Sequence, residues 1–299
     1  MRKISLAKDT NGLLRLCLNN APLFELGPLD QGFWPDGGYT APSDEALRYD
    51  IEMMKQCGFN MCRKHVKIEP ERWYCWCDKL GLLVWQDMPR GAAGNAKTDK
   101  RRSDPDAKQF ETELQALIEG RFNHPSIVVW IPFNEGWGQY DTERITGWVK
   151  QLDPTRLVIS ASGWLDHGTG DIQAIHGYPF PRPPKLDGKR ACVVGEFGGF
   201  GLAMPDKTWP GTKTWSYSGQ STPAELAEAY AKVLGLLEPL AKSGQVSGAV
   251  YTQLTDVEGE INGLMTYDRA VFKLDPAALA AANRKVCTAS ASAVPKPGP

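Results

Sequence analysis

Short apolar runs rich in β-branched and aromatic residues recur along the chain, and segments with helical spacing separate most of them. Continuous apolar runs of this length are typical of strands that are buried on both faces, as in parallel sheets. Eight such strands alternating with helices predict an α/β fold, a single (β/α)8 TIM barrel. The helices after the fifth and sixth strands are expected to be short or absent.

The expected strands are placed by their apolar runs and the helices by their spacing and caps. We expect strands at residues 23–29, 60–66, 82–87, 127–133, 157–161, 172–176, 191–195 and 248–253. We expect helices at residues 43–58, 70–80, 110–122, 142–152, from 222 onward and at 276–284. The signal at 222 is a capping box, in which Pro223 takes the first helical position and Glu225 closes the box.

The chain has 299 residues, a length that suits one barrel. Residues 1–22 are expected to form an N-terminal hairpin or extension that plugs the barrel bottom. Residues 23–288 would form the barrel. Residues 289–299 are rich in Pro, Ala and Ser and are predicted to be a disordered tail.

Charge and composition favour a small neutral partner. The formal net charge is -1 and no basic block is present, so nothing in the sequence points to nucleic acid or to an anionic membrane. Ten Trp and nine Tyr could supply rings that stack on the apolar faces of sugars, although most are expected in the core. No secretion signal or membrane span is recognisable, so the chain as given is expected to be cytoplasmic.

The seven cysteines are odd in number and lack paired metal-ligand spacing. Cys75 and Cys77 lie two positions apart on a predicted helix, so their side chains diverge. We therefore expect reduced, mostly buried thiols, with no metal and no disulfide.

Two of the predicted strands end on a glutamate. The string WIPFNE ends at Glu135, and VVGEFGG contains Glu196. Catalytic residues of parallel α/β barrels project from the carboxyl ends of the strands. Both carboxylates are therefore expected to point into one cleft.

Several strings together resemble glycoside hydrolase family 2, which includes β-galactosidases, β-glucuronidases and β-mannosidases. They are RKH at 63–65, CDKLGLLVWQDMP at 77–89, NHPSIVVWIPFNE at 123–135, HGYP at 176–179 and VVGEFGG at 193–199. Their order and spacing also match, over roughly residues 23–269. The resemblance implies a carbohydrate substrate, retaining hydrolysis of β-linked glycosides from the non-reducing end, and no cofactor.

The family mechanism assigns a role to each glutamate. Glu135 would be the general acid and base, and Glu196 the nucleophile that forms a glycosyl-enzyme. Retention implies carboxyl groups about 5–5.5 Å apart. Because like charges at that range resist joint ionisation, one carboxyl should stay protonated, and Glu135 is expected to be that one.

The resemblance also implies supporting residues. Asn134 would bind the sugar 2-hydroxyl, Arg63 would keep the nucleophile ionised, and Tyr178 would donate a hydrogen bond to it. From sequence alone, Asn134 could equally be a loop cap, and Arg63 a structural ion pair.

Four further residues are candidates for sugar contact. His176 and His65 are expected to line the sugar site. Asp87 could bind a hydroxyl or play a structural part, and Trp137, next to the acid, could stack on a sugar.

Two departures from the family pattern leave alternatives open. The chain reaches its first strand near residue 23, without the β-sandwich domains of full-length relatives, so apolar surface left exposed would promote homo-oligomers. The eighth strand carries Thr252 and Gln253 in place of a tryptophan, followed by an acidic loop that would bind hydroxyls, bind a cation or remain a solvated rim. One alternative is thus an incomplete barrel that binds carbohydrate without turnover. A metal-dependent barrel hydrolase using His176, His65 and Asp residues is the other.

Overall fold

The computed structural model describes residues 2–90 and 98–289. The predicted tail lies outside this range except for its first residue, and so does part of the loop after the third strand. No helix among the described residues has both the length and the apolar character that a membrane crossing requires.

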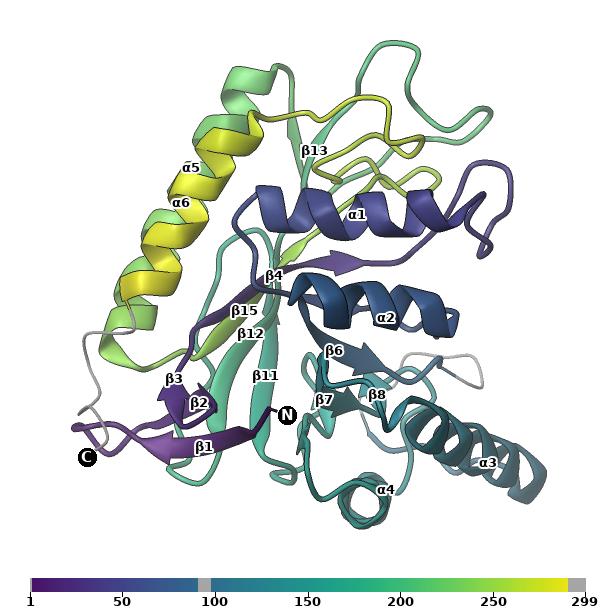
Figure 1. Cartoon of the computed structure of the whole chain (residues 1–299), viewed down its shortest axis with the longest axis vertical. Coiled ribbons are helices and arrows are strands. Elements are labelled where there is room, and N and C mark those ends of the chain that lie inside the picture. The colour runs from purple at the N-terminus through teal and green to yellow at the C-terminus, as the bar shows by residue number, and fades with distance from the viewer. Residues whose placement is uncertain (1, 91–97, 290–299) are drawn as a thin grey trace.

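Parallel strands form a closed barrel, which confirms the predicted fold class (Figure 1). Its eight positions, in order, are β4 (Glu25–Asp30), β5 (Met61–Lys64), β6 (Leu83–Asp87), β7 (Ile127–Ile131) with β8 (Phe133–Asn134), β9 (Leu157–Val158) with β10 (Ala161–Ser162), β11 (Ile172–Gly177), β12 (Ala191–Gly198) and β15 (Gly248–Thr252). The ring closes because β15 pairs with β4, while β7 pairs with β9 and β8 with β10.

Six helices surround the described part of the barrel. They are α1 (Asp44–Gln56), α2 (Glu71–Leu80), α3 (Asp104–Arg121), α4 (Thr142–Leu152), α5 (Pro223–Ser243) and α6 (Pro276–Ala289). As predicted, no described helix follows the fifth or the sixth strand position. In Figure 1, α5 and α6 lie against each other on one side of the barrel, and α3 and α4 lie on the other.

Some predicted boundaries were wrong. The fourth strand is interrupted at Pro132, which has no N–H to donate to a neighbouring strand. The fifth strand is likewise split, between Val158 and Ala161. Strand β12 continues past Gly195, so Glu196 lies within the strand rather than after it. Helix α6 runs on to Ala289, through a stretch that includes strong helix formers.

The barrel has two apolar cores, one outside the strands and one inside them. One core lies between the strands and the surrounding helices, and the other fills the barrel interior. The N-terminal strands β1 (Ile4–Lys8), β2 (Leu14–Leu18) and β3 (Ala21–Pro22) form an antiparallel sheet. From it, Ile4 and Leu16 join the interior core, so the hairpin covers the amino-terminal end of the barrel. The opposite end, where the strands finish, is left for the functional side chains.

Candidate active site

The carboxyl ends of several strands deliver polar side chains to one place. Arg63 comes from β5, Asp87 ends β6, Asn134 ends β8, His176 lies near the end of β11 and Glu196 near the end of β12. Each of these five side chains is buried. Strand direction alone therefore gathers residues that are far apart in the sequence, as in other barrels of this kind.

Glu196 is held by two donors. Arg63 donates from Nη1 to Oε1 at 2.9 Å, and the hydroxyl of Tyr178 donates to Oε2. The Tyr178 oxygen also lies 2.7 Å from Oγ1 of Thr252, which fixes the ring from the other side. Charge-assisted hydrogen bonds of this kind stabilise a carboxylate that accepts them. The arrangement suits an ionised Glu196.

Arg63 is the hub of the site and is 0% exposed. It forms a two-pronged ion pair with Asp87, with both distances 2.9 Å, and donates to Oδ1 of Asn134 at 2.8 Å. It also donates to the carbonyl of Gly195 at 3.2 Å. A planar guanidinium with five N–H donors can hold all these groups at once. Arg63 thereby fixes Glu196 and Asn134 in relation to each other.

Asp87 is fully engaged with protein groups. Besides Arg63, its Oδ2 lies 3.1 Å from Nδ1 of His65 and accepts from the backbone N–H of Val66 at 3.2 Å. Burial alone would raise the pKa of Asp87, but the charge of Arg63 and the contact with His65 hold it below its usual value. The structure thus favours the structural alternative for Asp87. It positions Arg63 and His65, and His65 is the half-buried member of this group.

Glu135 sits on a strained turn. Its φ is 54°, in the left-handed region that a residue with a side chain seldom adopts, and Gly136 follows with φ 73°. Its backbone N–H donates to Ser162 at 2.8 Å, which ties the turn to β10. Burial raises the pKa of Glu135, although the charges of His65, Arg63 and Arg90 oppose the shift. This carboxyl is therefore the one suited to keep a proton.

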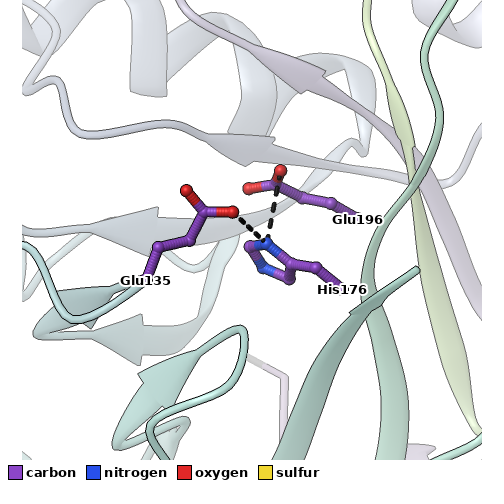
Figure 2. Close-up of side chains that lie close together, drawn as sticks. All are labelled: Glu135, His176 and Glu196. Atoms are coloured by element: carbon purple, nitrogen blue, oxygen red, sulfur yellow. Dashed lines mark hydrogen bonds and ion pairs between the residues drawn. The ribbon is translucent and has the colours of Figure 1, made fainter. Parts of the chain in front are cut away.

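His176 lies between the two glutamates (Figure 2). Its Nδ1 is 2.8 Å from Oε1 of Glu135 and 3.4 Å from Oε2 of Glu196. Burial lowers the pKa of His176 to about 4, so the ring is neutral near pH 7. Its Nε2 faces Ser162 at 2.8 Å and Arg63 at 3.5 Å. Because Arg63 can only donate, we assign the proton to Nδ1, where it is available to the carboxylates.

Gly195 explains how the ring comes so close to β12. A Cβ at this position would lie 2.4 Å from Oγ of Ser162 and 3.1 Å from a ring carbon of His176. A side chain here would clash with Ser162 and crowd the ring of His176.

One oxygen of Glu135, one oxygen of Glu196 and a ring nitrogen of His176 all lie within 4.8 Å of one another. Among the described residues, this is the one set of His, Cys, Asp and Glu side chains spaced to hold a metal ion. The alternative set of His176, His65 and Asp residues is not assembled in this part of the chain, because His65 lies against Asp87 while His176 faces Glu135. The acidic loop after β15 forms no such set either, since Asp256 is paired with Lys273 at 2.7 Å.

The tryptophans after the strands differ in environment. Trp137 is half-buried beside Glu135, with the guanidinium of Arg90 4.6 Å from its ring centre. Trp34 is buried beneath Arg269. Trp164 is exposed, with its ring centre 6.2 Å from that of His176. Trp164 is therefore better placed for a ligand than Trp34.

Sequence reasoning missed two residues of the site. Ser162 ends the short strand β10 and contacts His176, as described above. Tyr217 precedes β14 (Ser218–Gln220), and its ring stacks on Tyr178 with ring centres 3.6 Å apart. Neither lies in a recognisable string, so the only available signal was position: Ser162 follows a predicted strand end.

The protein is therefore an α/β-barrel protein with an acid–base site at the carboxyl ends of its strands. The site combines a buried arginine, a neutral histidine and a close pair of carboxyl groups. Residues 38–175 match the model of the family described as glycosyl hydrolases family 2, TIM barrel domain. The chain belongs to this family and carries its barrel domain.

Curated relatives agree with this assignment. "Beta-galactosidase 2" of Enterobacter cloacae is 31% identical over 210 residues, which are 67% of this chain and 19% of that protein. A β-galactosidase of Vibrio cholerae is 32% identical over 165 residues, covering 54% of this chain and 16% of the relative. The chain thus spans about a fifth of the length of these curated relatives.

The fold is shared with two kinds of solved glycosidase structure. A family 2 β-galacturonidase from Eisenbergiella tayi has a TM-score of 0.73 and 19% identity, over 95% of this chain and 54% of that one. A β-glucuronidase from Parabacteroides merdae has a TM-score of 0.68 and 19% identity, over 89% of this chain and 37% of that one.

Proposed function

We propose that this chain is a retaining β-glycosidase that removes a sugar from the non-reducing end of a β-linked glycoside. The observation that carries the proposal is the pair Glu135 and Glu196. One carboxylate oxygen of each lies within 4.8 Å of the other, and the two carboxyl groups have different surroundings. A separation of about 5–5.5 Å suits retention, whereas inverting enzymes need about 6.5–9.5 Å to admit a water molecule.

In the first step, Glu196 attacks the anomeric carbon while the bond to the aglycone oxygen breaks. Glu135 gives its proton to that oxygen, and a glycosyl ester forms on Glu196. The raised pKa of Glu135 supports this role, because the acid must be protonated before the reaction. The donors around Glu196 support the other role, because they favour the ionised nucleophile.

In the second step, Glu135, now ionised, takes a proton from water. The hydroxide oxygen attacks the anomeric carbon, the ester bond to Glu196 breaks, and the sugar leaves with its original configuration. Asn134 is oriented by Arg63 for the sugar 2-hydroxyl, an interaction that gains strength as positive charge develops. His176 donates from Nδ1 to Glu135 and remains neutral.

The comparisons support a carbohydrate substrate without naming it. The curated relatives are named β-galactosidases, and the structural neighbours are named β-glucuronidases and β-galacturonidases. Two sugar classes therefore stand as candidates, one neutral and one anionic.

A panel of aryl β-glycosides tests the proposal: galactoside, glucoside, glucuronide, galacturonide and mannoside, with this chain and with Glu196→Gln. We expect turnover of at least one sugar by the chain and its loss in the variant. If a folded protein binds a sugar yet turns over none of the panel, the incomplete-barrel alternative is the better account.

A further inference from the structure

A third carboxylate, that of Glu260, borders the site next to Trp215, whose backbone pairs with it. Glu260 lies in the loop after β15 and is half-buried. Its Oε1 accepts from the side-chain amide of Asn262 at 2.9 Å, and its Oε2 accepts from the amide of Gln31 at 3.2 Å. Gln31 follows β4, so Glu260 bridges the loops of the first and eighth strand positions. A carboxylate has about four acceptor positions, so these two donors leave it capacity for hydroxyl groups of a ligand.

The support beneath Glu260 is a closed amide network. Gln253, directly after β15 and 0% exposed, lies 2.8 Å from Gln31 through the side-chain amides and 2.7 Å from Asn262. Gln253 replaces the tryptophan that the family resemblance led us to expect on this strand. In its place the chain has a polar network that fixes a carboxylate.

Two exposed aromatic rings continue this side of the site. Trp215 is 49% exposed and Tyr217 is 45% exposed. The backbone of Trp215 pairs with the Glu260 loop, donating to Gly259 and accepting from Ile261. The ring of Tyr217 packs edge-on against Trp215 and face-on against Tyr178, which contacts Glu196. Glu260, the two rings and the nucleophile therefore border the same space.

The charge of Glu196 acts on Glu260. Burial and this charge both raise the pKa of Glu260, while its two amide partners and His65 oppose the shift. The amide donors favour the ionised form of Glu260, and only in that form does it repel an anionic sugar. Burial followed by the charges of Glu196, Glu260 and Glu135 raises the pKa of Tyr217. The charges of all three carboxylates thus act on the hydroxyl of Tyr217.

Three cations near Glu196 and Glu260 are already paired, and a fourth, the exposed Arg90, lies over Trp137 beside Glu135. Arg63 is saturated by Asp87 and Glu196, as described above. Lys273 is buried against Asp256 at 2.7 Å. Lys64, beside Arg63 on β5, is paired with Asp30 at 2.6 Å and Glu69 at 2.9 Å. An anionic sugar would meet Glu260 and Glu196 without a free cation among these three.

We propose that Glu260 is a specificity-determining residue, which binds hydroxyls of an uncharged glycone and excludes uronic acids. This inference rests on the proposed glycosidase function. It selects between the two sugar classes that the relatives leave open, because a second negative charge in the same pocket is unfavourable, and this is a common way of rejecting a wrong partner.

Steady-state kinetics on matched aryl galactoside and galacturonide, and on glucoside and glucuronide, test the proposal. For the wild type we expect kcat/KM to favour the uncharged sugar by about tenfold or more within at least one pair. Glu260→Gln should narrow that ratio about tenfold. Glu258→Gln is the matched control, since it removes an exposed carboxylate from the same loop and should leave the ratio unchanged.

A second measurement needs no variant. Inhibition of the wild type by free galactose should be stronger than by galacturonate. Equal or better turnover of uronides by the wild type would overturn the proposal, and so would an unchanged ratio in Glu260→Gln.

Failure of the glycosidase function itself would look different, with no turnover of any sugar by the wild type. In that case direct binding of galactose and galacturonate, measured by calorimetry, still tests the charge selection. Equal affinities would overturn it.

Discussion

The two sides of the site each hold one carboxyl group, and they surround it with different hydrogen-bond donors. On the β12 side, Glu196 is 4% exposed and accepts hydrogen bonds from Arg63 and Tyr178. On the β8 side, Glu135 is placed on a left-handed turn next to a neutral His176, without a direct ion pair to an arginine or lysine among the described residues. Both carboxyl groups are largely shielded from solvent, but in the described part of the chain only Glu196 has a cationic hydrogen-bond donor.

That difference teaches how one fold separates an acid from a nucleophile. A buried carboxyl with strong cationic donors is suited to be ionised, whereas one with only desolvation and a neutral partner retains its proton. His176 joins the two sides without adding charge, since burial keeps its pKa near 4. The comparison predicts distinct consequences for changes on each side.

The largest effect should come from Glu196→Gln, because it removes the nucleophile and leaves no group to form the glycosyl ester. We expect kcat to fall by about 10,000-fold or more. Steady-state turnover of an activated aryl glycoside measures it, and circular dichroism checks the fold. A loss of kcat of less than tenfold would contradict the assignment of Glu196 as the nucleophile.

Glu135→Ala should cost less, and selectively. Loss of acid assistance should slow glycosides with poor leaving groups by about 100- to 10,000-fold. For a dinitrophenyl glycoside, the glycosylation step should be spared, and azide should restore the second step by replacing the water that needs a base. The leaving-group dependence of kcat/KM is the measurement. Equal losses on every substrate, with no rescue by azide, would count against Glu135 as the acid.

Tyr178→Phe sharpens the account of the β12 side. It removes one of the two donors to Glu196, and a hydrogen bond to a charged group is worth about 1.5–3 kcal/mol. We therefore expect kcat/KM to fall roughly 10- to 100-fold. Tyr49→Phe, at an exposed tyrosine on α1, is the matched control. Activity equal to that of the control would show that Arg63 alone suffices.

His176→Gln tests the neutral link between the sides through pH-dependent stability. The pKa of His176 is lowered from 6.5 to about 4 in the folded state, so the unfolded state binds the proton first as pH falls. Stability is therefore lost as pH drops below 6.5, by about 2 kcal/mol at pH 5. Urea unfolding at pH 7 and pH 5 should show a smaller loss for the variant than for the wild type. An equal loss would mean that His176 does not resist protonation.

Much of the fold could be predicted because strand and helix periodicity are local. The runs around Val129 and Val193, and the caps at Ser43 and Thr222, gave the correct order of elements. Breaks inside strands were less accessible. Pro132 is visible in the sequence, but the equivalent gap after Val158 reflects how the barrel closes between two neighbouring strands.

The site could be predicted only where strings carried it. Glu135 follows a strand, Glu196 and His176 lie near the ends of two others, and the structure brings all three together at the carboxyl ends. Tyr217 and Gln31 were not foreseen, because their places depend on how irregular loops fold back over the barrel, which no local pattern determines. The acidic loop that contains Glu260 was already one of the alternatives for hydroxyl binding, but the orientation of Glu260 was not predictable, since it is set by amides from two different loops.

The most direct test of the central claim is to find where a sugar becomes covalently attached. Glu135→Ala, incubated with a dinitrophenyl β-glycoside that the panel shows to be a substrate, should accumulate the glycosyl-enzyme. Proteolysis and mass spectrometry then locate the sugar. We predict one added sugar on Glu196, whereas attachment to another residue, or turnover without any covalent intermediate, would contradict the account.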